Sequence, residues 1–323
     1  MNILLSMPDD KLSNVDIVGA LCDLGHEVFY VDHRANLENA KEFVSYYLQA
    51  VNIDVMLVLH LWPGDSYDKD AISGFQTLSP NTKFVAWMFD TICQGKLAYE
   101  NDQFIEQVKC YDAFFTMADC HVDKFREKGV NAFWCPQGFG RHCFVFSRQP
   151  KWDVSFIGQV DTSVYQTRRH FLNKIIKRFD NTKIYGATLS QDSNIVSHHA
   201  KRATVGMVDF ARVVSYSKIN LSFSGIIYGE ISAEVFGLFS ARQYRLMGCG
   251  GFTLASRTRL GEEMFVDGED LVFFDDAKDC IEKIGYYLEH EDERIRIADC
   301  GRDTILNEHT MTHSLTKLLR TIE

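Results

Sequence analysis

The sequence predicts an α/β protein made of two doubly wound, Rossmann-like domains. Two observations carry this prediction: short apolar strands alternate with helices along the chain, and strands such as Asp54 to His60 are continuously apolar. A continuous apolar run indicates that both faces of a strand are buried, as in a parallel sheet covered by helices. At 323 residues the chain is long enough for two such domains.

The first half of the chain opens with a strand over Asn2 to Ser6 and a helix that Ser13 or Asn14 can cap. That helix ends at Gly25. The next expected elements are a strand over 26–31, a helix over 36–50, strands over 54–60 and 83–89 with a loop or short helix over 62–78 between them, a helix near 104–109, a strand over 113–117, a helix over 119–128 and a strand over 131–134. This alternation predicts a parallel sheet in a domain over residues 1–148.

Polar residues follow several of these strands, and ligands of parallel sheets bind at the carboxyl ends of strands. Asp9, His60, Asp90 and His121 are the candidates. No G-x-G-x-x-G segment follows the first strand, so we do not expect this domain to bind a dinucleotide.

The second half is expected to begin with a strand over 152–158 that ends at Gly158, followed by a helix from about Val164. Next come a strand over 183–185, a surface loop through 198–202, a helix over 210–217, a strand over 218–223 and a loop over 225–239. Helices are then expected from Ser240, over 280–290, over 293–309 and over 312–322.

The charge distribution predicts an anionic ligand for this second half. Residues 141–218 hold thirteen Lys and Arg against five Asp and Glu, although the whole chain carries a net charge of −10. Arg168 lies in the first turns of the helix after Gly158, where backbone N–H groups and the helix dipole favour phosphate, and Lys218 begins a strand. The alternative is a solvated basic face.

Three glycines stand together where a helix meets the next strand: Gly248, Gly250 and Gly251, followed by Phe252 to Ala255. Residues without side chains allow a ligand to approach the backbone closely, and they adopt positive φ angles. The pattern is equally typical of a helix C-cap with a tight turn.

The order of motifs from this helix to the C-terminus resembles CgeB-like (spore-maturation type) glycosyltransferases, a GT-B branch related to families 4 and 1. The matching residues are Arg242, Tyr244, Arg245, Cys249, Gly250, Gly251, Phe252, Gly268, Glu269, Phe273, Tyr286, Tyr287, Leu288, His290, Gly301, His309 and Thr310. The resemblance implies two Rossmann-like domains facing a cleft: an acceptor domain over 1–148, a donor domain over 149–309, and a helix over 310–323 that packs back on the acceptor domain.

The resemblance also implies a nucleotide-diphosphate sugar as donor, UDP- or GDP-linked, with no cofactor or metal required and with retention of configuration. Donor contacts would come from Gly158, Arg168, Lys218, Arg242, Arg245, Gly250 and Gly251. Acceptor contacts would come from Asp9, His60 and His121, and Asp90 would accept the proton of the acceptor hydroxyl or hydrogen-bond to it, unless it only caps the next turn.

The chain departs from the related retaining enzymes at their paired glutamates, where it has Gly237 and Arg245. Glu230 or Glu234 would have to substitute in the sugar pocket, and Arg245 would be placed to bind a further phosphate. Two other functions stay open: a degenerate GT-B scaffold that binds nucleotide sugars without turnover, and a sugar-phosphate or nucleotide isomerase of the epimerase type.

The composition of the chain indicates where the protein is found and which ligands it binds. No apolar run is long enough to span a membrane, and the N-terminus lacks a basic segment before its acidic residues, so a cytoplasmic protein is expected. The nine cysteines form no C-x-x-C pair, which disfavours a zinc site. The acceptor is expected to be a glycan, a small molecule, a protein or hydroxymethylated DNA; the oligomeric state is open.

Overall fold

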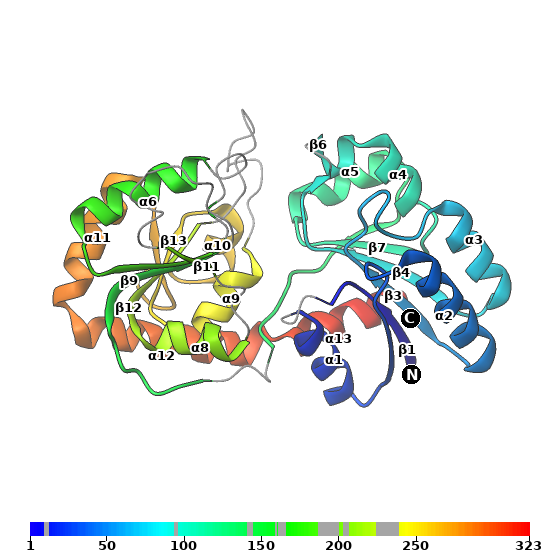
Figure 1. Ribbon diagram of the computed structural model, residues 1–323, viewed down its shortest axis with the longest axis horizontal. Helices are drawn as coiled ribbons and strands as arrows, with labels where there is room; N and C mark the ends of the chain where they lie inside the picture. Colours follow the sequence, from blue (N-terminus) through cyan, green and yellow to red (C-terminus); the bar gives the residue numbers. More distant parts are fainter. Residues whose placement is uncertain are drawn as a thin grey trace. The chain divides into compact units, whose positions relative to one another are not determined.

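The computed structural model describes residues 1–9, 13–93, 96–140, 145–158, 160, 166–186, 200–202, 207–223 and 239–323. The chain divides into two compact units: unit 1 is Met1–Gly140 with Met311–Glu323, and unit 2 is Arg141–Thr310. Each unit is a parallel α/β domain, so the predicted fold class is confirmed (Figure 1). None of the described helices is long and apolar enough to cross a membrane.

Six parallel strands form the sheet of unit 1 in the order β2-β1-β3-β4-β7-β8. Their bounds are β1 Asn2–Ser6, β2 Glu27–Val31, β3 Val55–Leu59, β4 Lys83–Met88, β7 Ala113–Thr116 and β8 Ala132–Trp134. The register places Leu5 between Tyr30 on β2 and Leu57 on β3. Because every neighbouring pair is parallel, all six carboxyl ends meet at one edge of the sheet.

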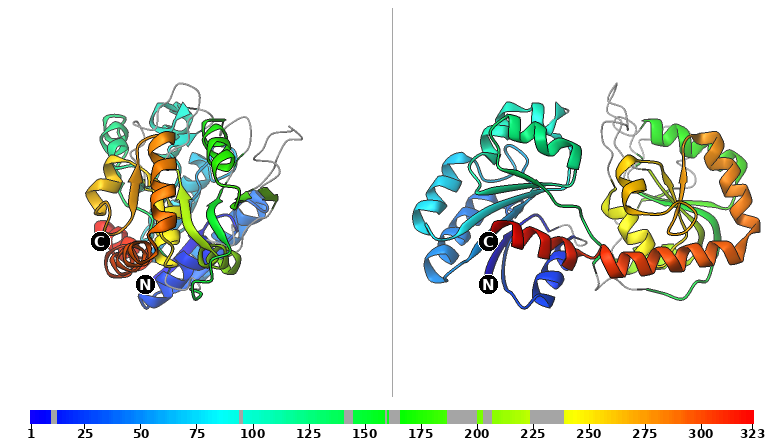
Figure 2. Two further views of the ribbon diagram at one scale, coloured as in Figure 1. Left: turned by 90° about the vertical axis from the view of Figure 1, so that its left-hand side faces the viewer. Right: turned by 180° about the vertical axis from the view of Figure 1, so that it is seen from behind.

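Helices cover both faces of this sheet. They are α1 Ser13–Asp23, α2 Leu37–Ala50, α3 Lys69–Leu78, α4 Asp102–Val108, α5 Val122–Glu127 and α13 Met311–Ile322, with 3₁₀ turns η1 Ala98–Glu100 and η2 Asp119–His121. The expected helix over 119–128 is therefore a 3₁₀ turn followed by α5. Although far apart in sequence, α1 and α13 lie side by side (Figures 1 and 2).

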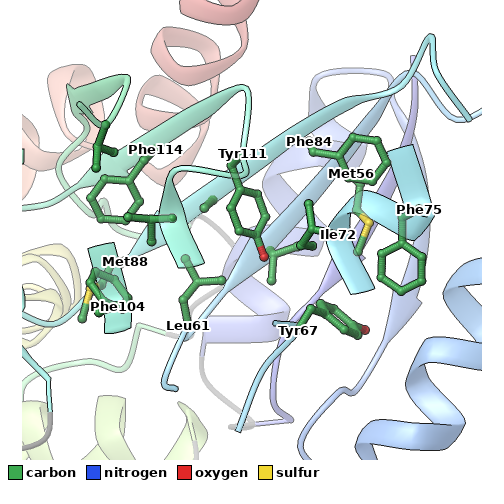
Figure 3. Packing of buried hydrophobic residues seen from close by; sticks show 14 of the residues in the cluster. Met56, Leu61, Tyr67, Ile72, Phe75, Phe84, Met88, Phe104, Tyr111 and Phe114 are labelled. Atoms are coloured by element: carbon green, nitrogen blue, oxygen red, sulfur yellow. The ribbon is translucent and has the colours of Figure 1, made fainter. Parts of the chain in front are cut away.

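The apolar pattern of the strands explains the core of unit 1. Alternate strand residues, including Met56, Phe84 and Phe114, are less than 2% exposed and face α2 to α5. Figure 3 shows their side chains packed with Phe104 and Tyr111. Burial of this many large side chains is the main stabilising contribution to the unit, since each contributes about 1.5–3 kcal/mol.

A short hairpin, β5 Ile92–Cys93 with β6 Lys96–Leu97, follows β4 and was not predicted. Its strands contain two residues each, which is too short for a periodic signal.

Unit 2 holds a second parallel sheet in the order β11-β10-β9-β12-β13-β14. Its strands are β9 Trp152–Ile157, β10 Thr182–Gly186, β11 Ala200–Arg202, β12 Ser217–Ser222, β13 Thr253–Ser256 and β14 Val272–Phe274. The prediction of a surface loop through residue 202 was wrong for Ala200–Arg202, which pairs in parallel with β10. An edge strand this short and polar carries no apolar pattern.

The helices of unit 2 are α6 Gln166–Arg178, α8 Met207–Ser215, α9 Ala241–Gly248, α10 Arg259–Met264, α11 Ala277–Glu289 and α12 Glu291–Glu308. On one face of the sheet, Leu172 of α6 and Ile284 of α11 are fully buried against Phe156 and Leu221. The helices α8 and α12 lie on the opposite side of the strands (Figure 1).

Two helical glycines in unit 2 give a matched test of this packing. A Cβ atom on Gly301 of α12 would lie 1.9 Å from the carbonyl oxygen of Asp270, whereas a Cβ on Gly285 of α11 would meet nothing within 4 Å. We expect Gly301→Ala to lower the free energy of unfolding by about 1–3 kcal/mol. We expect Gly285→Ala to raise it by about 0.5–1 kcal/mol, because alanine favours the helix. Urea unfolding measures both, and equal midpoints for the two variants would show that α12 does not approach Asp270 this closely.

Candidate functional site

Gly158 ends β9 at the carboxyl edge of the unit 2 sheet, with a φ of +155°. Its N–H donates to the carbonyl oxygen of Tyr185 at 2.8 Å, and a Cβ on Gly186 would lie 2.2 Å from the Gly158 carbonyl oxygen. A Cβ on Gly158 itself would lie 2.7 Å from Nη2 of Arg242. Glycine is therefore required here by both backbone conformation and space.

Two arginines converge on the aromatic ring of Phe156, two residues before Gly158. The guanidinium carbon lies 5.1 Å from the ring centroid for Arg242 and 5.5 Å for Arg168. Arg242 also donates through Nη1 to the carbonyl oxygen of Phe223, at the end of β12, over 3.4 Å. The fold thus brings together three of the predicted donor-site residues, Gly158, Arg168 and Arg242.

A further arginine joins this end of α6. Arg169 is 6% exposed, and its Nε and Nη2 have no hydrogen-bond partner among the described residues. An unpaired buried guanidinium is costly, and a bound anion would satisfy it. The sequence places Arg169 beside Arg168 but does not show that it is buried and unpaired.

Lys218, Gly250 and Gly251 lie at the other edge of the sheet. Lys218 is the second residue of β12, whose register pairs Ser217 with Trp152 at the start of β9. Gly158 follows the other end of β9. It is six residues after Trp152, which is about 20 Å along the strand at 3.3 Å per residue. The fold therefore does not bring these three residues to the Gly158 edge.

Each of them has a structural role where it lies. Lys218 Nζ forms an ion pair with Asp153 at 2.8 Å. Gly250 N–H donates to Met247 and Gly251 N–H to Leu246, which is a Schellman C-cap, with a φ of +78° at Gly250. A Cβ on Gly251 would lie 2.5 Å from Val214 Cγ1. The C-cap interpretation of the glycine segment accounts for its geometry.

Three predicted site residues of unit 2 remain: Arg245, Glu230 and Glu234. Arg245 is 9% exposed, one turn after Arg242 on α9, and its phosphate contact stays a prediction. Glu230 and Glu234 lie outside the described residues.

In unit 1, Asp90 follows β4 and His60 follows the neighbouring β3, so both lie at the carboxyl edge. Burial raises the pKa of the half-buried Asp90 carboxyl to about 6, although the nearby Arg34 opposes this shift. His60 has a φ of +58°, a conformation that other residues than glycine rarely adopt, and its ring packs edge-on against Phe89 at 5.6 Å.

A buried chain of hydroxyl and imidazole groups supports this edge. Ser6 Oγ lies 3.1 Å from Nδ1 of His33 and 2.8 Å from the hydroxyl of Tyr67. Burial, with a smaller contribution from His60, lowers the pKa of His33 to about 4, so this imidazole is neutral at pH 7. The sequence does not reveal the chain because its members come from three separate segments.

The other two candidates of unit 1 differ in their surroundings. Asp9 is exposed after β1. His121 is 2% exposed and packs edge-on against Tyr99 at 4.8 Å, so it lies in the core beneath the edge. Across the described parts of both units, no three His, Cys, Asp or Glu side chains are grouped to hold a metal ion.

Known proteins share this architecture. The sucrose-phosphate synthase of Thermosynechococcus elongatus superposes with a TM-score of 0.63 and 10% identity, covering 100% of this chain and 99% of that one. The Anabaena protein Alr3699/HepE in complex with UDP and glucose gives 0.61 and 12%, with the same coverage. The chain has the GT-B fold.

A family model described as glycosyl transferase-like matches residues 166–320, which include most of unit 2. This part of the chain, just under half of its length, is similar to glycosyl transferase-like proteins. Staphylococcus aureus TarM, solved with fondaparinux, α-GlcNAc-glycerol and UDP, superposes with a TM-score of 0.59 and 10% identity over 88% of this chain and 59% of that one. No curated protein matches the sequence.

Proposed function

We propose that the protein is a glycosyltransferase that moves a sugar from a nucleotide-diphosphate sugar to an acceptor hydroxyl. A UDP-sugar is our first choice of donor. The observation that carries this proposal is the pair Arg168 and Arg242 on the Phe156 ring beside Gly158, with the buried Arg169 next to Arg168 on α6. The stretch that matches the glycosyl transferase-like family model contains these arginines, and HepE, which shares the fold, was solved with UDP and glucose.

The chemistry of transfer explains why arginines would gather there. Breaking the bond between sugar and diphosphate leaves a negative charge on the leaving group, and fixed donors at that charge lower the barrier. The buried Arg169 has N–H groups with no hydrogen-bond partner among the described residues, and Arg168 and Arg242 lie on the Phe156 ring. We infer that these guanidinium groups stabilise the negative charge of the leaving diphosphate without a metal ion.

We place the acceptor on unit 1. Asp90 would accept a hydrogen bond or proton from the acceptor hydroxyl, with His60 beside it, and Asp9 is the outermost candidate contact. A glycan or small molecule is our first choice of acceptor because TarM was solved with saccharide ligands. Protein and hydroxymethylated DNA are the alternatives, and the expected outcome of transfer is retention, as in the retaining family 4 enzymes to which the CgeB-like group is related.

A thermal-shift panel tests the donor assignment. We expect one nucleotide class among UDP-, GDP-, ADP- and CMP-sugars to stabilise the protein by about 3 kcal/mol at 100 times Kd, which moves the melting temperature by a few degrees. The shift should persist in EDTA. A shift that EDTA abolishes would contradict metal independence, and no shift with any of these sugars would contradict the donor assignment.

A further inference from the structure

The edge of the unit 2 sheet opposite Gly158 carries a hollow of about 330 Å³. Its walls come from the chain before β9, the starts of β12 and β13, and the first half of α12, and all lie within unit 2. The lining residues are Arg148, Pro150, Val214, Ser217, Lys218, Gly250, Gly251, Phe252, Glu291, Arg294, Ile295 and Ala298.

Three cations and one carboxylate line this hollow. The carboxylates that pair with two of the cations, Asp153 with Lys218 and Asp299 with Arg148, are not part of the lining. Arg148 is held in place because its Nε and Nη2 both donate to the carbonyl oxygen of Gly250 at 3.3 Å. The lining residues themselves therefore carry a formal charge of +2.

Arg294 is the unusual member of the set. It is 5% exposed, and its nearest carboxylate is that of Glu291, whose side chain is 69% exposed and stands 3.9 Å away. Its Nη1 donates to the carbonyl oxygens of Tyr287 and Leu288, which orient the guanidinium but do not neutralise it. Burial accordingly lowers the pKa of Arg294. An anion in the hollow would offset the cost of this buried charge.

We propose that this hollow binds the phosphate group of a small phosphorylated metabolite, at a site separate from the donor site. Its volume is at the small end of the range for ligand pockets, which suits a phosphorylated monosaccharide better than a nucleic-acid strand. Arg148, Lys218 and Arg294 contact the phosphate, and the exposed carboxylate of Glu291 accepts hydrogen bonds from hydroxyl groups. The site does not depend on the glycosyltransferase activity.

Calorimetric titration of the whole chain with inorganic phosphate and with glucose 6-phosphate tests the proposal. We expect both to bind, glucose 6-phosphate more tightly, and we expect Lys218→Gln and Arg148→Gln each to weaken binding about tenfold or more. The matched control Lys278→Gln removes a lysine that is 84% exposed on α11 and should leave the affinity unchanged. Equal affinities in wild type and both hollow variants would overturn the proposal.

Two further variants test whether this site is distinct from the proposed donor site and whether a loss of binding reflects a loss of folding. Ile295 is 36% exposed at the wall of the hollow, so Ile295→Trp narrows the hollow without removing a charge. We expect this variant to weaken the binding of glucose 6-phosphate more than the binding of inorganic phosphate. Arg242→Ala should leave glucose 6-phosphate binding intact, and a loss there would assign the phosphate to the Gly158 edge instead. Displacement of glucose 6-phosphate by short duplex DNA would overturn the assignment to a small metabolite.

Discussion

Asp90→Asn is expected to lower turnover about a hundredfold or more while leaving donor affinity unchanged. The carboxylate stands at the end of β4, and an amide keeps its size but no longer accepts a proton, a contribution of typically 10²–10⁴ in rate. Steady-state kinetics with a saturating donor measure the change. Turnover at the wild-type rate would return Asp90 to the role of a turn cap, which asparagine fills equally well.

The pH profile sharpens this prediction. Because the pKa of Asp90 is raised to about 6, its reactive carboxylate form is lost as the pH falls through 6, and wild-type turnover should fall with it. The asparagine variant should lack this acidic limb. The raised pKa also means that ionised Asp90 destabilises the folded state increasingly as the pH rises from about 4 to 6. Asp90→Asn should therefore be no less stable than wild type at pH 7, so that unfolding does not explain lost activity.

A matched control is available in the same unit. Asp68 caps α3 by accepting from the N–H of Ala71 at 2.9 Å. Asp68→Asn makes the same carboxylate-to-amide change at a cap, where asparagine is as good as aspartate, and should leave turnover unchanged. Equal losses at Asp68 and Asp90 would indicate a general effect of charge on unit 1 rather than a role at the acceptor.

Arg242→Ala is expected to weaken donor binding about ten- to a hundredfold without unfolding the protein. Removing a charge-assisted contact with a diphosphate costs about 1.5–3 kcal/mol, which corresponds to that range of Kd. Isothermal calorimetry with the nucleotide diphosphate measures the loss. Unchanged affinity would remove Arg242 from the phosphate site despite its position against Gly158.

The control for Arg242 is an arginine on the next helix. Arg259 begins α10 and pairs with Glu263 one turn later, where its side chain is 50% exposed. Exposed pairs of this kind contribute little to stability, and Arg259→Ala should bind donor as wild type does.

The sequence predicts the fold well because several central strands are almost entirely apolar. Residues 54–60 and 83–89 indicate β3 and β4 from composition alone, and Asp90 can be placed at a strand end on that basis. Short elements escape such patterns, since β14 holds three residues and β5 and β6 two each.

The proposed donor site shows a different limit of prediction from sequence. Gly158, Arg168 and Arg242 come from three segments, and the fold brings them together on Phe156. The resemblance also implies a donor contact from Lys218, yet a residue at the start of a predicted strand must lie at the amino edge of a parallel sheet. This position of Lys218 could therefore have been predicted from the sequence. The burial of Arg169 and Arg294 could not be predicted, because it depends on which side chains surround them.

Release of UDP from UDP-sugars is the direct test of glycosyltransferase activity. We expect the wild-type chain to release UDP in the presence of a glycan or small-molecule acceptor, in EDTA, and we expect this release to fall about a hundredfold in Asp90→Asn. Tight binding of a UDP-sugar with no UDP release across glycan, small-molecule, protein and hydroxymethylated-DNA acceptors would contradict it. The protein would then be a nucleotide-sugar binding protein on a GT-B scaffold.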